Sequence, residues 1–421
     1  MNMLQLQSAC GLLALTALAW AVGGFRRPVP WRAVVAGLGL QLLLAAAMLH
    51  LPPLRAALGA LGAAVDALAA ATRAGSSFVF GYLGGGPVPF DVTRPEAGFI
   101  LFFQGLPLVL VVGALSAVLY HWRVLPFLVR GVSRVLRAAF GLSGATGISV
   151  AANVFVGMVE AVLFIRGWFA GLSRGEMLVV MTAGLATISG NVLVLYATFL
   201  APVVPDAAGQ LLAASLVSAP AAILAARLML PDAGSGGTAD GTTPAGTEAD
   251  PPRLYDSTME ALVRGTADGL SLLLNIAAAL IVFVALVALA NAVLRPLTGE
   301  TLEGIVGTLS WPLAWLTGVP AAEAGAAGRL LGLRTVVNEF VAYLSLAGAE
   351  GAALSPRSRI ILTWALCGFA NLASVGIMVS GLVALCPERR ADIVRLGFPS
   401  LVAGTIACLM TGAVVGALTP G

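Results

Sequence analysis

Residues 270–294 read LSLLLNIAAALIVFVALVALANAVL, a run without a single charged side chain. About 20 consecutive apolar residues are enough to cross the hydrocarbon core of a bilayer as an α-helix. The segment therefore predicts a transmembrane helix. Similar long apolar runs occur throughout the sequence, so we predict several transmembrane helices along the chain.

The composition is that of a membrane protein. Hydrophobic residues make up 59% of the 421 residues and charged residues only 10%, whereas a soluble domain has about 25% charged residues. All 23 basic residues are arginine, and the net charge of +3 is too small and too scattered to indicate a nucleic-acid partner. The four cysteines lack the spacing of a zinc site or a disulfide framework. We therefore expect the lipid bilayer to be the main solvent of the chain.

Eight stretches are long and apolar enough to span a bilayer: 3–23, 33–50, 98–121, 176–200, 207–230, 270–294, 360–385 and 396–418. The first lacks the basic start of a signal peptide, so we expect a retained transmembrane helix. Segments 54–72 and 122–140 differ, because arginines recur among their apolar residues. This pattern is typical of amphipathic helices at the membrane interface, and plain connecting loops are the alternative.

One polar stretch of low complexity divides the chain. Residues 232–252 read DAGSGGTADGTTPAGTEADPP and hold too few apolar side chains to fold. We predict a flexible linker over 232–255 that joins two halves.

The two halves resemble each other. The first contains VFVGMVEAVLF (154–164) followed by TAGLATISGNVLVL (182–195), and the second contains RTVVNEFVAYLSL (334–346) followed by LCGFANLASVGIMV (366–379). Each half thus has an apolar segment with one carboxylate, then a span interrupted by glycine and small polar residues. Interrupted spans at matching places in two halves indicate a transporter binding site near the middle of the membrane. Chance similarity between segments rich in alanine and glycine is the alternative.

The matching carboxylates are Glu160 and Glu339. A carboxylate in the hydrocarbon region costs about 2.5 to 3.5 kcal/mol on insertion scales, so it should face a cavity and have a partner. The nearest opposite charges, Arg166 and Arg334, are five or six residues away. A structural hydrogen bond between helices is the alternative for either residue alone, but the symmetric pair favours a functional role.

Small polar side chains cluster in the interrupted spans. The first span holds Thr187, Ser189 and Asn191, and the second holds Asn371 and Ser374. A broken helix also frees backbone carbonyls, and carbonyls with a hydroxyl suit a small hard cation. A lone Ser or Thr more often bonds the carbonyl four residues earlier in its own helix, so the prediction depends on the cluster.

The sequence contains no recognisable catalytic set. His50 and His121 lie at span ends, and Gly84 to Gly86 lack the lysine and hydroxyl residue of a phosphate-binding loop. We therefore expect neither an enzyme nor an ATP-driven pump. A channel on the same fold and a receptor-like protein with an inactive site remain alternatives. Concentrative uptake separates them, because a channel cannot exceed the electrochemical gradient.

Six stretches follow the order of a known family: FQGLPLVLVVGALSAVLYH (103–121), AANVFVGMVEA (151–161), SAPAAILAARLMLP (218–231), RGTADGLSLLLNIAAALIVFVALVALAN (264–291), NEFVAYL (338–344) and CGFANLASVGIMVSGL (367–382). Over nearly its whole length, the chain resembles the concentrative nucleoside transporter family. The resemblance implies an all-α polytopic homotrimer in the bacterial inner membrane. Each protomer would have eight spans, two re-entrant helical hairpins, interfacial helices and an internal two-fold repeat.

The resemblance also implies a transport domain that moves against a trimeric scaffold. The corresponding segments are N-terminal helices (1–97), a scaffold and an interfacial helix (98–142), the first transport repeat (143–231), the linker (232–255), a second scaffold and interfacial helix (256–310) and the second transport repeat (311–421).

In this family the second hairpin binds ribose through the Glu of Asn-Glu-Phe. That residue is Glu339 here, and Asn371 and Ser374 also reproduce the ribose side. Phe369 stands where the family places an aromatic residue beside the substrate, and we place Val192 at the same site. The resemblance therefore implies an intact ribose-binding half.

The base-binding half departs from the family pattern. The family's Gly-Gln-Thr-Glu, whose polar side chains face the nucleobase, reads Gly157, Met158, Val159, Glu160 here. A site that lacks hydrogen-bonding groups cannot strongly reject analogues, and methionine adapts to many shapes. We expect broader base tolerance, or a bulkier or modified nucleoside. Base recognition by water molecules and Glu160 is the alternative.

The family's sodium site uses backbone carbonyls and one hydroxyl, at positions that correspond to Asn153, Val156, Thr187 and Ile188. Threonine in place of the family's serine keeps the hydroxyl. Some bacterial members resemble proton-driven carriers, and a membrane glutamate can relay protons. Sodium is therefore the expected coupling ion, with the proton as the alternative, and no other cofactor is implied.

Overall fold

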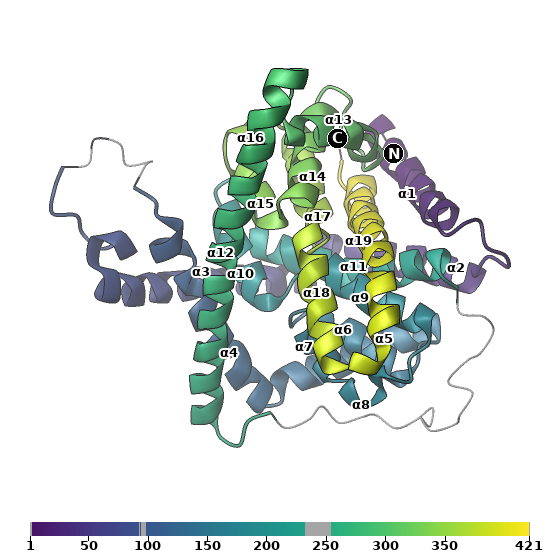
Figure 1. The fold of residues 1–421 in the computed structure, drawn as a ribbon, viewed down its shortest axis with the longest axis horizontal. Helices are drawn as coiled ribbons and strands as arrows, with labels where there is room; N and C mark the ends of the chain where they lie inside the picture. The colour runs from purple at the N-terminus through teal and green to yellow at the C-terminus, as the bar shows by residue number, and fades with distance from the viewer. Residues whose placement is uncertain (1, 92, 94–97, 232–253, 421) are drawn as a thin grey trace.

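The computed structural model describes residues 2–91, 93, 98–231 and 254–420, and the regular structure in these ranges is entirely helical (Figure 1). Within them, eight helical stretches are long and apolar enough to cross a membrane. The predicted all-α polytopic fold is therefore confirmed. The predicted linker at 232–255 lies almost wholly outside the described residues, and both chain termini lie at one end of the molecule.

The N-terminal part contains α1 (Met3–Val22), α2 (Trp31–His50), α3 (Pro52–Phe80), α4 (Pro107–His121) and α5 (Val124–Phe140). One face of α5 is buried at positions spaced three and four apart, namely 126, 129, 133, 136 and 140. This spacing gives one apolar face, so α5 is an amphipathic helix and the alternative of a connecting loop is wrong. Arg130, Arg134 and Arg137 lie on this helix.

Two of the predicted segments need correction. Segment 54–72, predicted as an amphipathic helix at the interface, lies within the 29-residue helix α3, which is part of a stretch long and apolar enough to span. In Figure 1 it runs across the direction of α12 (Thr258–Thr298) and extends away from the other helices. The segment predicted at 360–385 is two helices, α17 (Pro356–Ala365) and α18 (Leu372–Leu385), because residues 366–371 are not helical.

The internal repeat is visible in the order of the helices. The first repeat contains α6 (Gly144–Asn153), α7 (Glu160–Leu163), α8 (Arg166–Phe169), α9 (Arg174–Ala186), α10 (Gly190–Leu200) and α11 (Ala207–Met229). The second contains α14 (Ala324–Val336), α15 (Glu339–Ala347), α16 (Ala349–Ala352), α17, α18 and α19 (Arg390–Leu418). In both repeats a pair of helices joined by a short turn precedes a broken helix and then a long one. The predicted interruptions are therefore real breaks, at 187–189 and 366–371.

The long helices of the two repeats form the centre of the molecule. α11 and α19 pack against each other, α9 packs against both, and α17 joins them from the second repeat. In the apolar part of α11, 83% of the residues are buried, whereas in that of α12 only 6% are. The first broken helix, α9 with α10, is also 83% buried, and α18 of the second buries only one face. α12 lies at the edge (Figure 1).

α12 is a peripheral helix of 41 residues, which corresponds to a length of about 60 Å at a rise of 1.5 Å per residue. It packs along α4, where a side chain at Gly113 would lie 3.0 Å from the Gly265 carbonyl and 3.2 Å from the Gly269 Cα. Small residues at such contacts let two membrane helices approach closely. α13 (Leu302–Leu316) follows and packs on α14.

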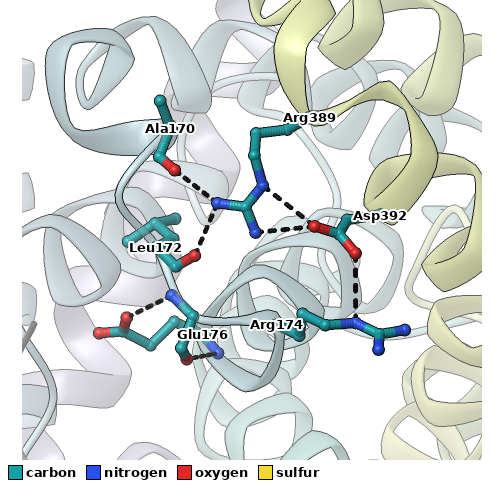
Figure 2. A network of polar contacts seen from close by, with 7 residues as sticks. Ala170, Leu172, Arg174, Glu176, Arg389 and Asp392 are labelled. Atoms are coloured by element: carbon teal, nitrogen blue, oxygen red, sulfur yellow. Dashed lines mark hydrogen bonds and ion pairs between the residues drawn. The ribbon is translucent and has the colours of Figure 1, made fainter.

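A polar network joins the two repeats at the end of the molecule opposite the termini (Figure 2). Arg389 donates to the carbonyls of Ala170 and Leu172, which connect α8 to α9. The same guanidinium lies 3.1 Å from the Asp392 carboxylate, which also pairs with Arg174 at 3.3 Å. Arg389 of the second repeat thus stabilises the loop between α8 and α9 of the first repeat.

We expect Arg389→Ala to lower the melting temperature more than either Asp392→Asn or Arg174→Gln. The Arg389 side chain is 18% exposed and supplies two hydrogen bonds between the repeats, whereas that of Arg174 is 53% exposed and supplies one ion pair. Exposed ion pairs contribute only about 0.2 to 1 kcal/mol. Thermal unfolding in detergent, monitored by tryptophan fluorescence, gives the melting temperatures of the three variants. Equal losses in the three variants would contradict it.

Candidate functional site

Glu339 is positioned by the start of α15. Asn338 caps the helix, because its side chain accepts a hydrogen bond from the Val341 N–H at 3.0 Å. This leaves Glu339 in the first turn, where the helix dipole favours a negative charge. The Asn-Glu sequence therefore both starts the helix and fixes the carboxylate at its end.

Three helices meet at the Glu339 carboxylate, which is only 6% exposed. Its Oε1 accepts a hydrogen bond from the Tyr196 hydroxyl of α10 at 2.7 Å, and its Oε2 accepts one from Asn371 Nδ2 at 2.7 Å. Asn371 caps α18 through a bond from the Ser374 N–H to its Oδ1, at 2.8 Å. A carboxylate has about four acceptor positions, so about half of them remain for hydroxyl groups of a solute.

The structure brings Glu339, Asn371 and Ser374 together as predicted, but the prediction did not include Tyr196. A single tyrosine in an apolar span gave no strong signal, and its partner is 143 positions away in the sequence. Val192, 6% exposed, lies one turn before Tyr196 on α10. Phe369 is partly buried in the break before α18, where its carbonyl accepts from the Asn371 N–H.

A cluster of oxygen atoms lies at the break between α9 and α10. The Thr187 hydroxyl is 3.0 Å from the Asn153 carbonyl and 2.8 Å from the Ala183 carbonyl. A hydroxyl has one proton to donate, so it cannot satisfy both carbonyls fully. Gly190 at the start of α10 donates to the Phe155 carbonyl at 3.0 Å, which ties the turn after α6 to this break.

The side chain of Asn153 is the strongest sign of a cation site. Its Nδ2 donates to the Ser149 carbonyl at 3.0 Å, but its Oδ1 has no hydrogen-bond partner among the described residues. The residue is 1% exposed, and an unsatisfied buried acceptor costs about 1 to 3 kcal/mol. A cation at this oxygen would remove that cost.

Three other polar contacts involve residues that the sequence singled out. The Ile188 carbonyl lies 3.5 Å from the Ser215 hydroxyl, and Val156 is partly buried and donates through its N–H to the Ala152 carbonyl. Asn191 accepts a hydrogen bond from Ser116 of α4 at 2.9 Å. Asn191 therefore links α10 to α4.

The turn after α6 packs against both broken helices. A side chain at Gly184 of α9 would lie 2.9 Å from the Met158 Cβ, and one at Gly381 of α18 would lie 2.7 Å from a Val159 methyl group. Glycine at these two positions lets the turn approach closely. Met158 and Val159 are therefore partly buried between the two repeats.

Glu160 differs from its counterpart Glu339. It is exposed, whereas Glu339 is buried. Its carboxylate folds back over Gly157, where a side chain would lie 2.1 Å from Glu160 Oε2. The two carboxylates that match in sequence thus have different surroundings in this structure.

Comparison with known proteins places the chain in a family. A family model described as the C-terminus of Na+ dependent nucleoside transporters matches residues 210–416, and the corresponding N-terminal model matches residues 10–83. Together they cover more than half of the chain. The chain belongs to the concentrative nucleoside transporter family.

Relatives in this family match the chain over its whole length. An uncharacterized transporter of Haemophilus influenzae is 36% identical over 98% of this chain and 97% of its own. Nucleoside permease NupC of Helicobacter pylori is 31% identical over 97% of this chain and 96% of its own. The structure of CNTnw in an inward-facing substrate-bound state matches with a TM-score of 0.88 and 33% identity, over 100% of both chains.

Family membership confirms the resemblance seen in the sequence and the multi-pass helical fold. The relatives are named as transporters and permeases, which confirms the expectation of a transporter in place of an enzyme.

Proposed function

We propose that the protein is a secondary active transporter that couples uptake of nucleosides across the bacterial inner membrane to sodium. The observation that carries the proposal is the buried Glu339 carboxylate, held by Tyr196 and Asn371 at the meeting point of two broken helices. A charged acceptor in such a place suits the vicinal hydroxyls of ribose, because hydrogen bonds to a charged group are worth about 1.5 to 3 kcal/mol.

The unpaired Asn153 Oδ1 supports sodium as the coupling ion. With Thr187 it offers amide, hydroxyl and carbonyl oxygens, which are ligands for hard cations. The relatives' family description names sodium. Proton coupling is the alternative, since the buried Glu339 and its hydrogen-bonded Tyr196 hydroxyl resemble a proton relay.

The arrangement of helices supports transport by alternating access. We assign α4 and α12 to a scaffold, and the two repeats to a transport domain whose paired helices form re-entrant hairpins. The sequence segments place most of α13 with the scaffold, up to residue 310; because α13 packs on α14, we assign it to the second repeat. The exposed apolar surface of α12 would be covered by lipid and by the other protomers of a homotrimer.

Uptake into proteoliposomes tests the substrate class. We expect saturable uptake of radiolabelled uridine, adenosine or inosine that other nucleosides inhibit and that free bases and free ribose do not. Uptake that free ribose or a free base inhibits as strongly as a nucleoside would contradict the proposal, as would the absence of saturable nucleoside uptake.

We expect Met158→Gln combined with Val159→Thr to sharpen discrimination between uridine and inosine. A matched hydrogen bond in a dry site contributes about 0.5 to 1.5 kcal/mol, and an unmatched buried group costs about 1 to 3 kcal/mol. One base should therefore gain a few-fold in affinity and the other lose about ten-fold. Competition for uptake measures both values.

The two single variants test which side chain faces the base. Val159 packs against Gly381 of α18, so Val159→Thr alone should change selectivity less than Met158→Gln alone. If the double variant keeps the parent's preference, Met158 and Val159 do not line the base pocket.

A further inference from the structure

α10 connects the candidate cation site to the candidate substrate site. Its first residue, Gly190, lies three residues after Thr187. Gly190 donates a hydrogen bond to the carbonyl of Phe155, which lies two residues after Asn153. Further along the same helix, the Tyr196 hydroxyl donates to Glu339 at 2.7 Å. Six residues separate Gly190 from Tyr196, which is about 9 Å of helix at 1.5 Å per residue. One short helix thus touches both sites.

The Tyr196 side chain is buried between α10, which carries it, and α15. It is 1% exposed, and its ring lies 4.7 Å from the Tyr343 ring and 6.0 Å from the Phe340 ring, both on α15. The rigid ring has only two rotatable bonds and is enclosed by these neighbours. A shift at the start of α10 would therefore move the hydroxyl relative to the Glu339 carboxylate.

We propose that Tyr196 is the residue through which an ion at Asn153 and Thr187 raises the affinity of Glu339 for the nucleoside. Asn153 and Thr187 would hold the cation, and the hydrogen bond from Gly190 to the Phe155 carbonyl would then fix the start of α10 relative to them. The Tyr196 hydroxyl would then hold one carboxylate oxygen, so that the remaining acceptor positions of Glu339 point toward the ribose hydroxyls. This inference rests on the proposed sodium-coupled function.

One consequence distinguishes this route from a direct electrostatic effect. The field of a cation would act on Glu339 whether or not the Tyr196 hydroxyl is present, because it needs no contact. Coupling through Tyr196 requires the hydroxyl. Coupling by either route is reciprocal, so the nucleoside must raise the sodium affinity by the same factor as sodium raises the nucleoside affinity.

Tyr343 provides a matched control. Its ring packs on Tyr196 and its hydroxyl is equally buried, but that hydroxyl donates to the Thr363 carbonyl at 2.8 Å and not to Glu339. Tyr196→Phe and Tyr343→Phe therefore delete the same buried group from neighbouring rings, and only the first breaks the bond to Glu339.

The test measures uridine binding by calorimetry to the full-length protein in detergent, in sodium chloride and in choline chloride. The coupling factor is the ratio of the two affinities, and couplings between sites are typically about 5- to 150-fold. We expect Tyr196→Phe to reduce the factor at least five-fold and Tyr343→Phe to keep the parent's factor. Binding of radioactive sodium with and without uridine should show the same pattern.

A parent-like factor in Tyr196→Phe would overturn the inference, as would an equal loss in Tyr343→Phe. A factor of one in the parent protein would instead contradict sodium coupling itself. Should Tyr196→Phe bind no uridine, 3-fluorotyrosine at position 196 keeps the ring and makes the hydroxyl a stronger donor. For the 3-fluorotyrosine protein we expect a coupling factor larger than that of the parent protein. An unchanged or smaller coupling factor overturns the inference.

Discussion

Glu339→Gln is expected to reduce the uptake of ribose-bearing nucleosides by at least ten-fold at low substrate concentration. The change keeps the size of the side chain but removes the charge, and a charged acceptor is worth about 1.5 to 3 kcal/mol per hydrogen bond. It also places an amide NH2 beside two groups that donate to Glu339, the Tyr196 hydroxyl and the Asn371 Nδ2. Both effects weaken the binding of hydroxyl groups.

Initial rates of uridine uptake in proteoliposomes check this prediction. The matched control is Glu350→Gln on α16, an exposed carboxylate of the same repeat, which should transport like the parent. Size-exclusion profiles of both variants establish that they fold. A Glu339→Gln protein that folds and transports at the parent's rate would remove Glu339 from the substrate site.

Thr187→Val is expected to raise the sodium concentration needed for half-maximal uptake by about ten-fold or more. Valine keeps the branched shape of threonine but lacks the hydroxyl, which lies 3.0 Å from the Asn153 carbonyl in the oxygen cluster. Loss of one ligand, with a buried carbonyl left unsatisfied, costs about 1 to 3 kcal/mol. The sodium dependence of uridine uptake measures the shift.

Two control variants separate the hydroxyl from the packing of Thr187. Thr187→Ser keeps the hydroxyl, so it should restore most of the parent's sodium dependence. Thr363→Val removes a buried hydroxyl that donates to the carbonyl four residues earlier, as Thr187 does to Ala183. Thr363→Val should leave the sodium dependence unchanged. The same shift in both valine variants would show that Thr187 acts only in packing.

The parts of the fold and of the site that depend on local chemistry could be predicted from the sequence. The breaks in the two spans followed from glycines and small polar residues in otherwise apolar stretches. Asn371 and Ser374 belong to one helix cap, and the family resemblance grouped them with Glu339. Such features act over a few residues, so a single sequence reveals them.

The parts that depend on contacts between distant segments could not be predicted. The Tyr196 bond to Glu339 joins two repeats, and no local pattern marks a tyrosine that will meet a carboxylate. Glu160 matches Glu339 in sequence, but it is exposed because the turn that carries it packs differently. The full length of α3 was missed because Arg55 and Arg73 interrupt its apolar residues.

Accumulation of radiolabelled uridine in proteoliposomes against its own gradient tests the central claim most directly. With sodium outside and choline inside, we expect the internal concentration to rise above the external one and to fall back when an ionophore dissipates the sodium gradient. Uridine that only equilibrates under every ion gradient would indicate a channel. Accumulation that follows an imposed pH gradient and ignores sodium would contradict sodium coupling.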